Sequence, residues 1–328
     1  MRRATWGKQL TATPFFHVSG SLFNFVTVAA LTSHCILPKF SPHDYLQAIQ
    51  EMHPNASMLV PSMVNALLNY PDVAEYELSS MLMVMVGGAV LSPATLERAG
   101  QLFLNCDFVN TYGMTETAGG VTFMYPDLPA IEKTKRPASI GLPVHTGEIQ
   151  IVNAAGETLA PGETGEIVIR AKNVMQGYWQ QPEKTAEALR GGWLHSGDTG
   201  YMDEDGFLFV VDRLKDMIIT GGENVYPAEV ENVLFTHPAI ANCAVIGLPD
   251  EQWGERVHAV IIPGDGMKID TATIIAHCRQ FIAGYKCPRS VDIRTDALPM
   301  SGAGKVLKHI LRDEYEQVSP QPPEPPPY

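Results

Sequence analysis

The segment LMVMVGGAVLSPATLERAGQLFLNCDFVN, Leu82–Asn110, has the pattern of a strand, a helix and a second strand in succession. The apolar runs Leu82–Val86 and Asp107–Asn110 are typical of buried strands, and the spacing of Pro93–Phe103 between them is helical. Ser92 is a suitable helix cap, with proline at the first helical position. Strands that alternate with helices are the signature of an α/β fold.

The same alternation continues toward the N-terminus and changes after Gly147. A helix over Pro42–Met52 and a strand at Met58–Val60 extend the α/β pattern. From Gly147 the stretches EIQIV, GEIVIR and GFLFVVD alternate with glycine turns, which predicts an antiparallel sheet. After Arg213 we expect a small α+β region with strands at Ala244–Ile246 and Val257–Ile262 and helices near Ala272–Ala283 and Lys305–Tyr315. The predicted regions are therefore 1–146 (α/β), 147–214 (β), 215–316 (α+β) and a proline-rich tail, 317–328, that forms neither helix nor ladder.

Composition excludes several classes of function. The 328 residues are 45% hydrophobic and carry a net charge of −13, which argues against nucleic acid or an anionic membrane surface as the main partner. The five cysteines form no CxxC pair and are odd in number, so neither a zinc site nor a disulfide framework is indicated. The apolar run Leu22–Leu37 is interrupted by polar residues, so we predict a buried helix there and no integral membrane segment. A reducing cytoplasm is the expected location.

The stretch NTYGMTET, Asn110–Thr117, directly follows a predicted strand. Open α/β sheets bind ligands beyond the carboxyl ends of their strands, so a loop here suits a nucleotide. Tyr112 offers a flat face to a purine, Gly113 permits close approach of the backbone, Thr115 can donate to a phosphate and Glu116 can hold magnesium. An ordinary loop with a capping threonine is the alternative.

Three further stretches carry candidate residues. VGGAVL, Val86–Leu91, ends a strand with two glycines that let the backbone lie against a ligand or simply turn. Asp198 precedes a hairpin and can accept from both hydroxyls of a ribose, and Arg213 can hold a ribose or phosphate at the domain boundary. PMSGAGKV, Pro299–Val306, imitates a phosphate-binding loop, but proline and valine occupy its required glycine and hydroxyl positions.

The sequence argues against a calcium-binding loop and against a serine hydrolase. The DEDG stretch imitates a calcium loop, but its first ligand would be Tyr201, which cannot serve. No GxSxG occurs, so a serine hydrolase lacks its nucleophile turn.

Taken in order, TPFFHVSG (Thr13–Gly20), VGGAVL, NTYGMTET, the long stretch from Gly192 to Glu231 and PMSGAGKV resemble the acyl-adenylate-forming (AMP-binding) superfamily, with most similarity to acyl-CoA synthetases and fatty-acid–CoA ligases. The resemblance extends from Thr13 to Tyr315. It implies an ATP-dependent acid–thiol ligase that forms an acyl-AMP and pyrophosphate and then a thioester with CoA. An enzyme that loads a carrier protein would use the same residues.

The resemblance also implies roles for individual residues. Lys305, Thr115 and Glu116 would be catalytic, with Glu116 on Mg²⁺; region 215–316 would be a mobile lid that rotates at Lys215. His17, Val18, Gly113 and Met114 would line a mostly apolar pocket for a fatty or aromatic acid, although His17 also suits a satisfied core position. Gly221, Gly222 and Glu223 would line the CoA tunnel. The ATP/AMP site would comprise Gly88, Ala89, Asn110, Thr111, Tyr112, Gly113, Met114, Thr115, Asp198, Arg213 and Lys305.

One motif of the superfamily is missing from this sequence. The loop of the type [ST]SG[ST]TGxPKG, which grips the β- and γ-phosphates, lies well upstream of the FHxxG segment, and only MRRATWGKQLTA precedes Thr13. We therefore expect an incomplete large domain, hence a truncated product or a chain whose partner supplies the rest. A non-catalytic AMP- or partner-binding fragment is the second functional hypothesis.

Overall fold

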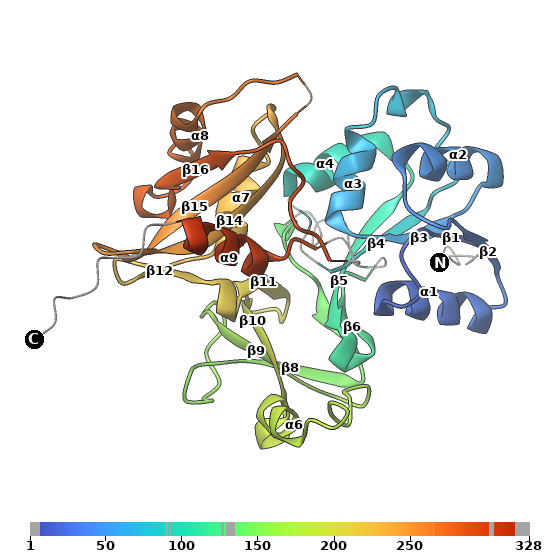
Figure 1. The fold of residues 1–328 in the computed structure, drawn as a ribbon. Helices are drawn as coiled ribbons and strands as arrows, with labels where there is room; N and C mark the ends of the chain where they lie inside the picture. Colours follow the sequence, from blue (N-terminus) through green and yellow to red (C-terminus); the bar gives the residue numbers. More distant parts are fainter. Residues whose placement is uncertain are drawn as a thin grey trace, which may run out of the picture. The chain divides into compact units, whose positions relative to one another are not determined.

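The computed structural model describes residues 7–88, 91, 93–125, 128, 135–264, 266–301 and 305–318. For residues 316–318 only the backbone is described. These residues form two compact units (Figure 1). Unit 1 contains the described residues up to Val210, and unit 2 contains those from Val211 onward. The hinge and the domain bounds stay predictions, and each unit is described by itself below.

The larger sheet of unit 1 has seven strands in the order β2-β1-β3-β4-β5-β6-β7. The pairs from β2 to β5 are parallel, whereas β5, β6 and β7 pair antiparallel. Parallel strands joined through helices confirm the predicted α/β class. The elements are β1 (Lys8–Thr11), α1 (Val18–Ala29), β2 (Ser33–Ile36), α2 (Pro42–Met52), β3 (Ala56–Leu59), α3 (Pro61–Leu68), η1 (Val73–Glu75), β4 (Met83–Val86), α4 (Pro93–Leu102), β5 (Asp107–Met114), η2 (Thr115–Thr117), β6 (Gly119–Phe123) and β7 (Leu142–Pro143).

Local sequence explains why these helices begin where they do. The Ser41 hydroxyl accepts from the Asp44 N–H at 3.1 Å, and Pro42 occupies the first helical position of α2. Tyr45, Leu46 and Ile49 are the buried face of this helix and pack into the core beside the sheet.

The prediction of one buried helix over Leu22–Leu37 was wrong. The segment contains the second part of α1, a turn at Leu31 with φ of 53°, and strand β2. Phe25 and Val28 of α1 are 67% and 64% exposed, so burial is confined to one face of the helix. Apolar composition alone could not separate a helix from a helix followed by an edge strand.

A second sheet of unit 1 has the order β11-β10-β9-β8. Its strands are β8 (Gly147–Val152), β9 (Gly165–Ala171), β10 (Leu194–Met202) and β11 (Leu208–Arg213), with α6 (Pro182–Ala188) and η3 (Arg190–Gly192) between β9 and β10. β8, β9 and β10 pair antiparallel, as the alternating pattern predicted. Their inward residues form one core that includes Ile149, Ile167 and Leu208. β11 runs across the boundary between the units.

Unit 2 is an α+β unit around a five-stranded sheet, in which β16 pairs with β15 beside the order β13-β12-β15-β14. Helix α8 ends five residues before the predicted end, and α9 begins at Lys308, so Lys305 precedes the helix that was predicted to contain it. The elements are η4 (Leu214–Asp216), β12 (Ile218–Thr220), β13 (Glu223–Val225), α7 (Pro227–Leu234), β14 (Ile240–Asp250), β15 (Gly254–Pro263), α8 (Thr271–Cys278), η5 (Gly284–Lys286), β16 (Ser290–Ile293) and α9 (Lys308–Val318).

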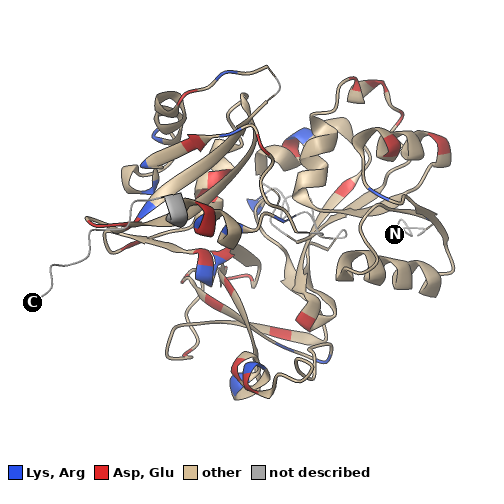
Figure 2. Ribbon diagram, in the orientation of Figure 1, with Lys and Arg blue, Asp and Glu red and all other residues tan. Residues whose placement is uncertain are grey.

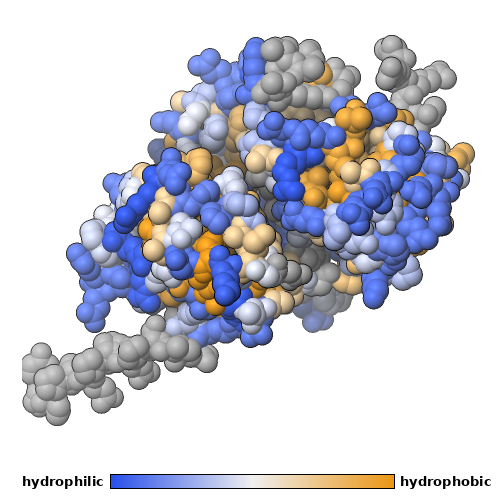
Figure 3. Space-filling model, turned by 90° about the horizontal axis from the view of Figure 1, so that it is seen from above, coloured by the Kyte–Doolittle hydropathy of each residue, from blue (hydrophilic) through white to orange (hydrophobic). Residues whose placement is uncertain are grey.

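Charged residues are spread over both units, and acidic and basic residues alternate on α6 (Figure 2). Large apolar side chains also reach the surface, for example Phe16 at 82% and Leu104 at 83% exposure, and apolar areas are visible in Figure 3. Within the part of the chain that the structure describes, no helix is both long and apolar enough to span a membrane.

Candidate functional site

Strand β5 carries the segment that was predicted to be a loop. Asn110–Met114 continue the strand, because β5 leaves its parallel partner β4 at Asn110 and pairs antiparallel with β6 from Thr111. At Gly113 a side chain would lie 1.9 Å from the Gly119 carbonyl oxygen. The missing side chain at Gly113 therefore permits close approach of β6, and only Thr115–Thr117 form a turn.

Tyr112 and Asp198 lie together in unit 1 although 86 residues separate them. The Tyr112 hydroxyl donates to the Asp198 carboxylate at 2.7 Å, and Asp198 is 5% exposed. The Tyr112 ring and Met114 also pack against the core of the second sheet. The two sheets thus meet at an aromatic ring beside a buried carboxylate, which are groups suited to a purine and to ribose hydroxyls.

Asn110 provides an independent test of whether these residues fit a nucleotide. Its Nδ2 donates to the Ser139 carbonyl at 3.2 Å, while its Oδ1 is buried and has no hydrogen-bond partner among the described residues. A buried acceptor without a partner is costly. It suits a ligand that brings a donor, such as the amino group of adenine.

The turn after β5 holds Glu116 between Thr115 and Thr117. Thr115 is exposed, whereas Thr117 is buried, accepts from the Met114 N–H at 3.0 Å and donates to the Gly119 carbonyl at 2.7 Å. The capping threonine is therefore Thr117. The Thr115 side chain, two residues earlier, stays accessible to a phosphate.

Glu116 is held by a segment that the sequence analysis missed. The Tyr178 hydroxyl donates to its Oε1 at 2.9 Å, and the Met175 N–H donates to its backbone carbonyl at 2.7 Å. Burial first, and then the Glu116 carboxylate, raise the pKa of Tyr178, so this hydroxyl keeps its proton at neutral pH. Asn173 also donates to the Thr117 carbonyl at 2.6 Å. The only signal in the sequence is an aromatic residue after a glycine in MQGYW, which is too weak to predict this contact.

No group of three or more metal-binding side chains occurs among the residues described. A single carboxylate nevertheless fits Mg²⁺, which is commonly bound by one or two carboxylates together with substrate phosphates and waters. Glu116 is suited to that role.

The other candidates of unit 1 differ in their surroundings. Gly88 has φ of 85°, a conformation that favours glycine, and Ala89 lies outside the described residues. A side chain at Gly87 would lie 3.1 Å from Met58 and 3.3 Å from Thr111, so packing alone accounts for this glycine. His17 caps α1: its Nδ1 accepts from the Ser19 N–H at 3.3 Å, which places Val18 at the start of the helix.

The remaining candidates belong to unit 2, so their positions are described only within that unit. Gly221 and Gly222 have φ of 60° and 83° and form the turn between β12 and β13, at whose start Glu223 is exposed. Gly221 lies against the Trp253 ring, where a side chain would come within 2.8 Å. Lys305 precedes α9, and its N–H donates to the Ser301 hydroxyl at 3.1 Å.

The predicted hinge residue, Lys215, lies between two anchored aspartates of unit 2. Asp212 Oδ1 accepts from the Arg213 N–H and Asp212 Oδ2 from the Ala228 N–H, each at 2.7 Å. Asp216 pairs with Arg312 at 2.7 Å. Both aspartates are therefore held by residues of unit 2.

Asp212, Glu231 and Lys308 form the charge cluster of unit 2. The Lys308 ammonium lies 2.8 Å from Glu231 Oε1. Burial alone would lower the pKa of Lys308, but the carboxylates of Glu231 and Asp212 outweigh it and raise that pKa. This lysine stays charged, and it neutralises carboxylates that would otherwise be costly to bury.

Comparison with known proteins now defines the class. Residues 3–179 match the family described as AMP-binding enzyme, and residues 229–305 match the AMP-binding enzyme C-terminal domain. The chain therefore belongs to the AMP-binding enzyme family.

Several similar proteins are named as CoA synthases or CoA ligases. The chain is 42% identical to feruloyl-CoA synthase of Amycolatopsis sp. over 94% of its own length and 62% of the relative, and 38% identical to long-chain-fatty-acid–CoA ligase of Bacillus subtilis over 94% and 54%. A solved structure of the anthranilate CoA ligase AuaEII in complex with anthranoyl-AMP matches with a TM-score of 0.86 and 28% identity, over 95% of this chain and 60% of that one. The chain thus spans less than two thirds of the length of these relatives.

Proposed function

We propose that this chain carries the nucleotide and acyl-adenylate site of an ATP-dependent acyl-CoA ligase. The observation that carries the proposal is the contact between Tyr112 and Asp198 at the junction of the two sheets, in a member of the AMP-binding enzyme family. The Asn110 acceptor, for which the described part of the chain offers no partner, adds support from this chain itself.

Each candidate residue has a chemical role in this proposal. Tyr112 stacks on adenine. Asp198 accepts hydrogen bonds from the ribose hydroxyls, and Arg213 donates to the ribose. The other residues that line the site are Gly88, Ala89, Asn110, Thr111, Gly113 and Met114. Thr115 donates to the α-phosphate, and Glu116 holds the Mg²⁺ that accompanies ATP. Lys305 supplies positive charge where the carboxylate and the α-phosphate meet.

The proposed reaction has two steps, adenylation of the acid and thioester formation. A carboxylate oxygen of the acid attacks the α-phosphorus of ATP, a new P–O bond forms, and pyrophosphate leaves as the bond to the β-phosphate breaks. The CoA sulfur then attacks the acyl carbon, a C–S bond forms, AMP leaves, and the thiol proton passes to solvent. Rotation at Lys215 would exchange Lys305 for the turn at Gly221, Gly222 and Glu223 between the steps.

A fatty or aromatic acid is the proposed substrate. The proposed pocket residues His17, Val18, Gly113 and Met114 are mostly apolar, and apolar walls suit such acids. The similar proteins are by name a feruloyl-CoA synthase, a long-chain-fatty-acid–CoA ligase and an anthranilate CoA ligase.

Two alternatives are kept because specific observations favour them. The same residues would serve an enzyme that loads a carrier protein. The residues of the nucleotide site would also fit a fragment that binds AMP or a partner without catalysis. A separate chain that supplies the rest of the large domain stays a prediction, which none of the comparisons supports, and the cytoplasmic location also stays a prediction.

The test is acid-dependent exchange of labelled pyrophosphate into ATP. It would be measured on the 328-residue chain and on the same chain preceded by the phosphate-loop region of the Bacillus subtilis relative. We expect a fatty or aromatic acid to stimulate exchange in the extended protein, followed by thioester formation on free CoA. Thioester formed only on a carrier protein would favour the alternative acceptor, and exchange stimulated by no acid would contradict the ligase proposal.

Lys305→Ala tests whether Lys305 acts in adenylation and not in thioester formation. Lys268→Ala, at an exposed lysine, is the control. Loss of exchange is expected in the first variant only, with thioester formation from preformed acyl-AMP largely retained. Equal loss of both steps would contradict the role of Lys305.

A further inference from the structure

Strand β10 is distorted at the residue that the proposed function places on the ribose. His195 pairs with Val168 and Thr199 pairs with Glu166, so three residues of β10 face the single residue Ile167 of β9. These three, Ser196, Gly197 and Asp198, are called here the β10 bulge. Gly197 has φ of 69°, which favours glycine. The bulge, and not the regular pleat of the strand, determines where the Asp198 carboxylate points.

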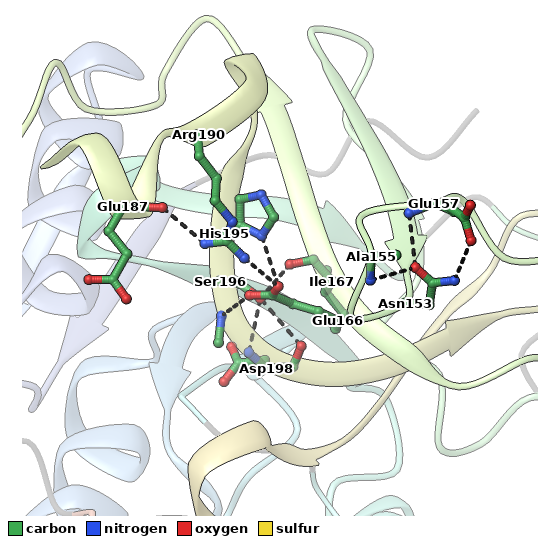
Figure 4. A network of polar contacts seen from close by, with 11 residues as sticks. Asn153, Ala155, Glu157, Glu166, Ile167, Glu187, Arg190, His195, Ser196 and Asp198 are labelled. Carbon is green, nitrogen blue, oxygen red and sulfur yellow. Dashed lines mark hydrogen bonds and ion pairs between the residues drawn. The ribbon is translucent and has the colours of Figure 1, made fainter. Parts of the chain in front are cut away.

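Glu166 of β9 holds the bulge from one side (Figure 4). Its Oε1 accepts from the Gly197 N–H at 3.2 Å, and its Oε2 lies 2.8 Å from His195 Nδ1 and 3.2 Å from Arg190 Nη2. The Glu166 side chain is 14% exposed. The Arg190 guanidinium is fixed in turn by the Glu187 carbonyl at 3.0 Å. One largely covered carboxylate therefore binds both the strand before the bulge and the glycine at its centre.

Ser196 holds the bulge from within. Its hydroxyl donates to the Ile167 carbonyl at 2.6 Å and accepts from the Asp198 N–H at 3.0 Å. A single hydroxyl thus replaces the ladder hydrogen bonds that the extra residues interrupt, and its acceptor side is directed at the backbone of Asp198 itself.

We propose that Glu166 and Ser196 are positioning residues for ribose recognition: they fix the β10 bulge so that Asp198 meets the ribose hydroxyls, without touching the nucleotide themselves. The proposal rests on the proposed function, because it needs a ribose at Asp198. It goes beyond that function by assigning the alignment of the carboxylate to two residues of β9 and β10. A ribose bound by a misaligned carboxylate loses hydrogen bonds that adenine and phosphate contacts do not replace.

The experiment compares AMP with 2′,3′-dideoxy-AMP, which lacks both ribose hydroxyls, by isothermal titration of the full chain. Hydrogen bonds to a charged group predict that the parent chain binds AMP at least about tenfold more tightly than the dideoxy compound. Glu166→Gln and Ser196→Ala should each weaken AMP about fivefold or more and leave the dideoxy compound unchanged. Glu148→Gln is the matched control, since Glu148 pairs with Arg170 on the exposed face of the same sheet.

The outcomes distinguish failure of the proposed function from failure of the positioning role. Binding of neither compound by the parent chain would overturn the proposed function and, with it, this inference. Normal discrimination against the dideoxy compound in both variants, or equal weakening of both compounds, would overturn the positioning role alone. Ser196→Ala removes one oxygen atom and keeps the test decisive if Glu166→Gln does not fold.

Discussion

Two aspartates on neighbouring strands, Asp198 of unit 1 and Asp212 of unit 2, are used in different ways. Asp198 accepts from the neutral hydroxyl of Tyr112. In Asp212 both oxygens accept backbone N–H groups, and Lys308 of the charge cluster lies close enough to act on its titration. Asp198 thus joins two distant strands of unit 1 through a side-chain hydroxyl, whereas Asp212 holds backbone groups of its own unit. The two carboxylates therefore differ in their partners, which are a side-chain hydroxyl for Asp198 and backbone N–H groups for Asp212.

Removal of the cation from the charge cluster should give the largest effect. Lys308→Met leaves the partly buried carboxylates of Glu231 and Asp212 without their counter-charge, so we expect unit 2 to lose about 3 kcal/mol of its free energy of unfolding, the lower end of the range for a buried pair. Urea unfolding followed by circular dichroism measures this. Lys268→Met, at an exposed lysine of the same unit, should change stability by less than about 0.5 kcal/mol. A loss below about 1 kcal/mol in Lys308→Met would show that the cluster is not structural.

The second prediction concerns pH and another buried group of unit 2. His258 is 5% exposed, its Nδ1 lies 2.8 Å from the Ser290 hydroxyl, and its ring centroid lies 4.6 Å from that of Tyr315. Burial lowers the pKa of His258 to about 4; Asp292 opposes this shift and Arg256 adds to it.

The direction of the change in stability with pH follows from which state of the chain binds the proton. Between the folded pKa and the ordinary value near 6.5 the unfolded chain binds the proton and the folded chain does not, so stability rises with pH across this window. The gain contributed by His258 is at most about 3 kcal/mol. His258→Asn should flatten the dependence in urea unfolding between pH 4 and 6.5, and an unchanged slope would contradict the assignment.

Exchange of each aspartate for asparagine tests the comparison itself. Asp198→Asn should weaken AMP binding about 10- to 100-fold, since hydrogen bonds to a charged acceptor contribute about 1.5–3 kcal/mol, with a smaller change in stability. Asp212→Asn should do the reverse: reduced stability with AMP affinity unchanged. Calorimetric titration and urea unfolding of both variants measure the two effects, and loss of AMP affinity in both would remove the distinction.

The smallest expected effect is that of the tyrosine hydroxyl. Tyr112→Phe keeps the ring for adenine and removes one neutral donor to Asp198, so AMP affinity should fall about fivefold, equivalent to about 1 kcal/mol. Tyr112→Ala, which removes the ring as well, should weaken AMP further. Equal affinity of the phenylalanine and alanine variants would show that the ring does not contact the base.

Local signals in the sequence predicted much of the fold. Helix α2 was predicted over Pro42–Met52 from its helical pattern, and the structure has it there, with Ser41 as cap and Pro42 at the first position. The antiparallel sheet followed from strict alternation in EIQIV and GEIVIR. Strand β5 was predicted too short. Its second part is stabilised by pairing with β6, and the sequence of β5 carries no signal for the change of partner strand.

The site was predictable only in part, for the same reason. Tyr112, Asp198 and Glu116 lie in recognisable motifs, but their supports come from far along the chain. Tyr178 reaches Glu116 across 62 residues, and Glu166 reaches the β10 bulge across 31. Such contacts depend on sheet register and on the bulge, which local propensity does not determine.

A crystal structure of the chain with an acyl-sulfamoyl adenosine, a stable analogue of acyl-AMP, tests the central claim most directly. The account predicts ribose hydroxyls within about 3 Å of the Asp198 carboxylate and the adenine ring against Tyr112. An adenosine bound away from β5 and the β10 bulge, or ribose hydroxyls that make no contact with Asp198, would contradict it.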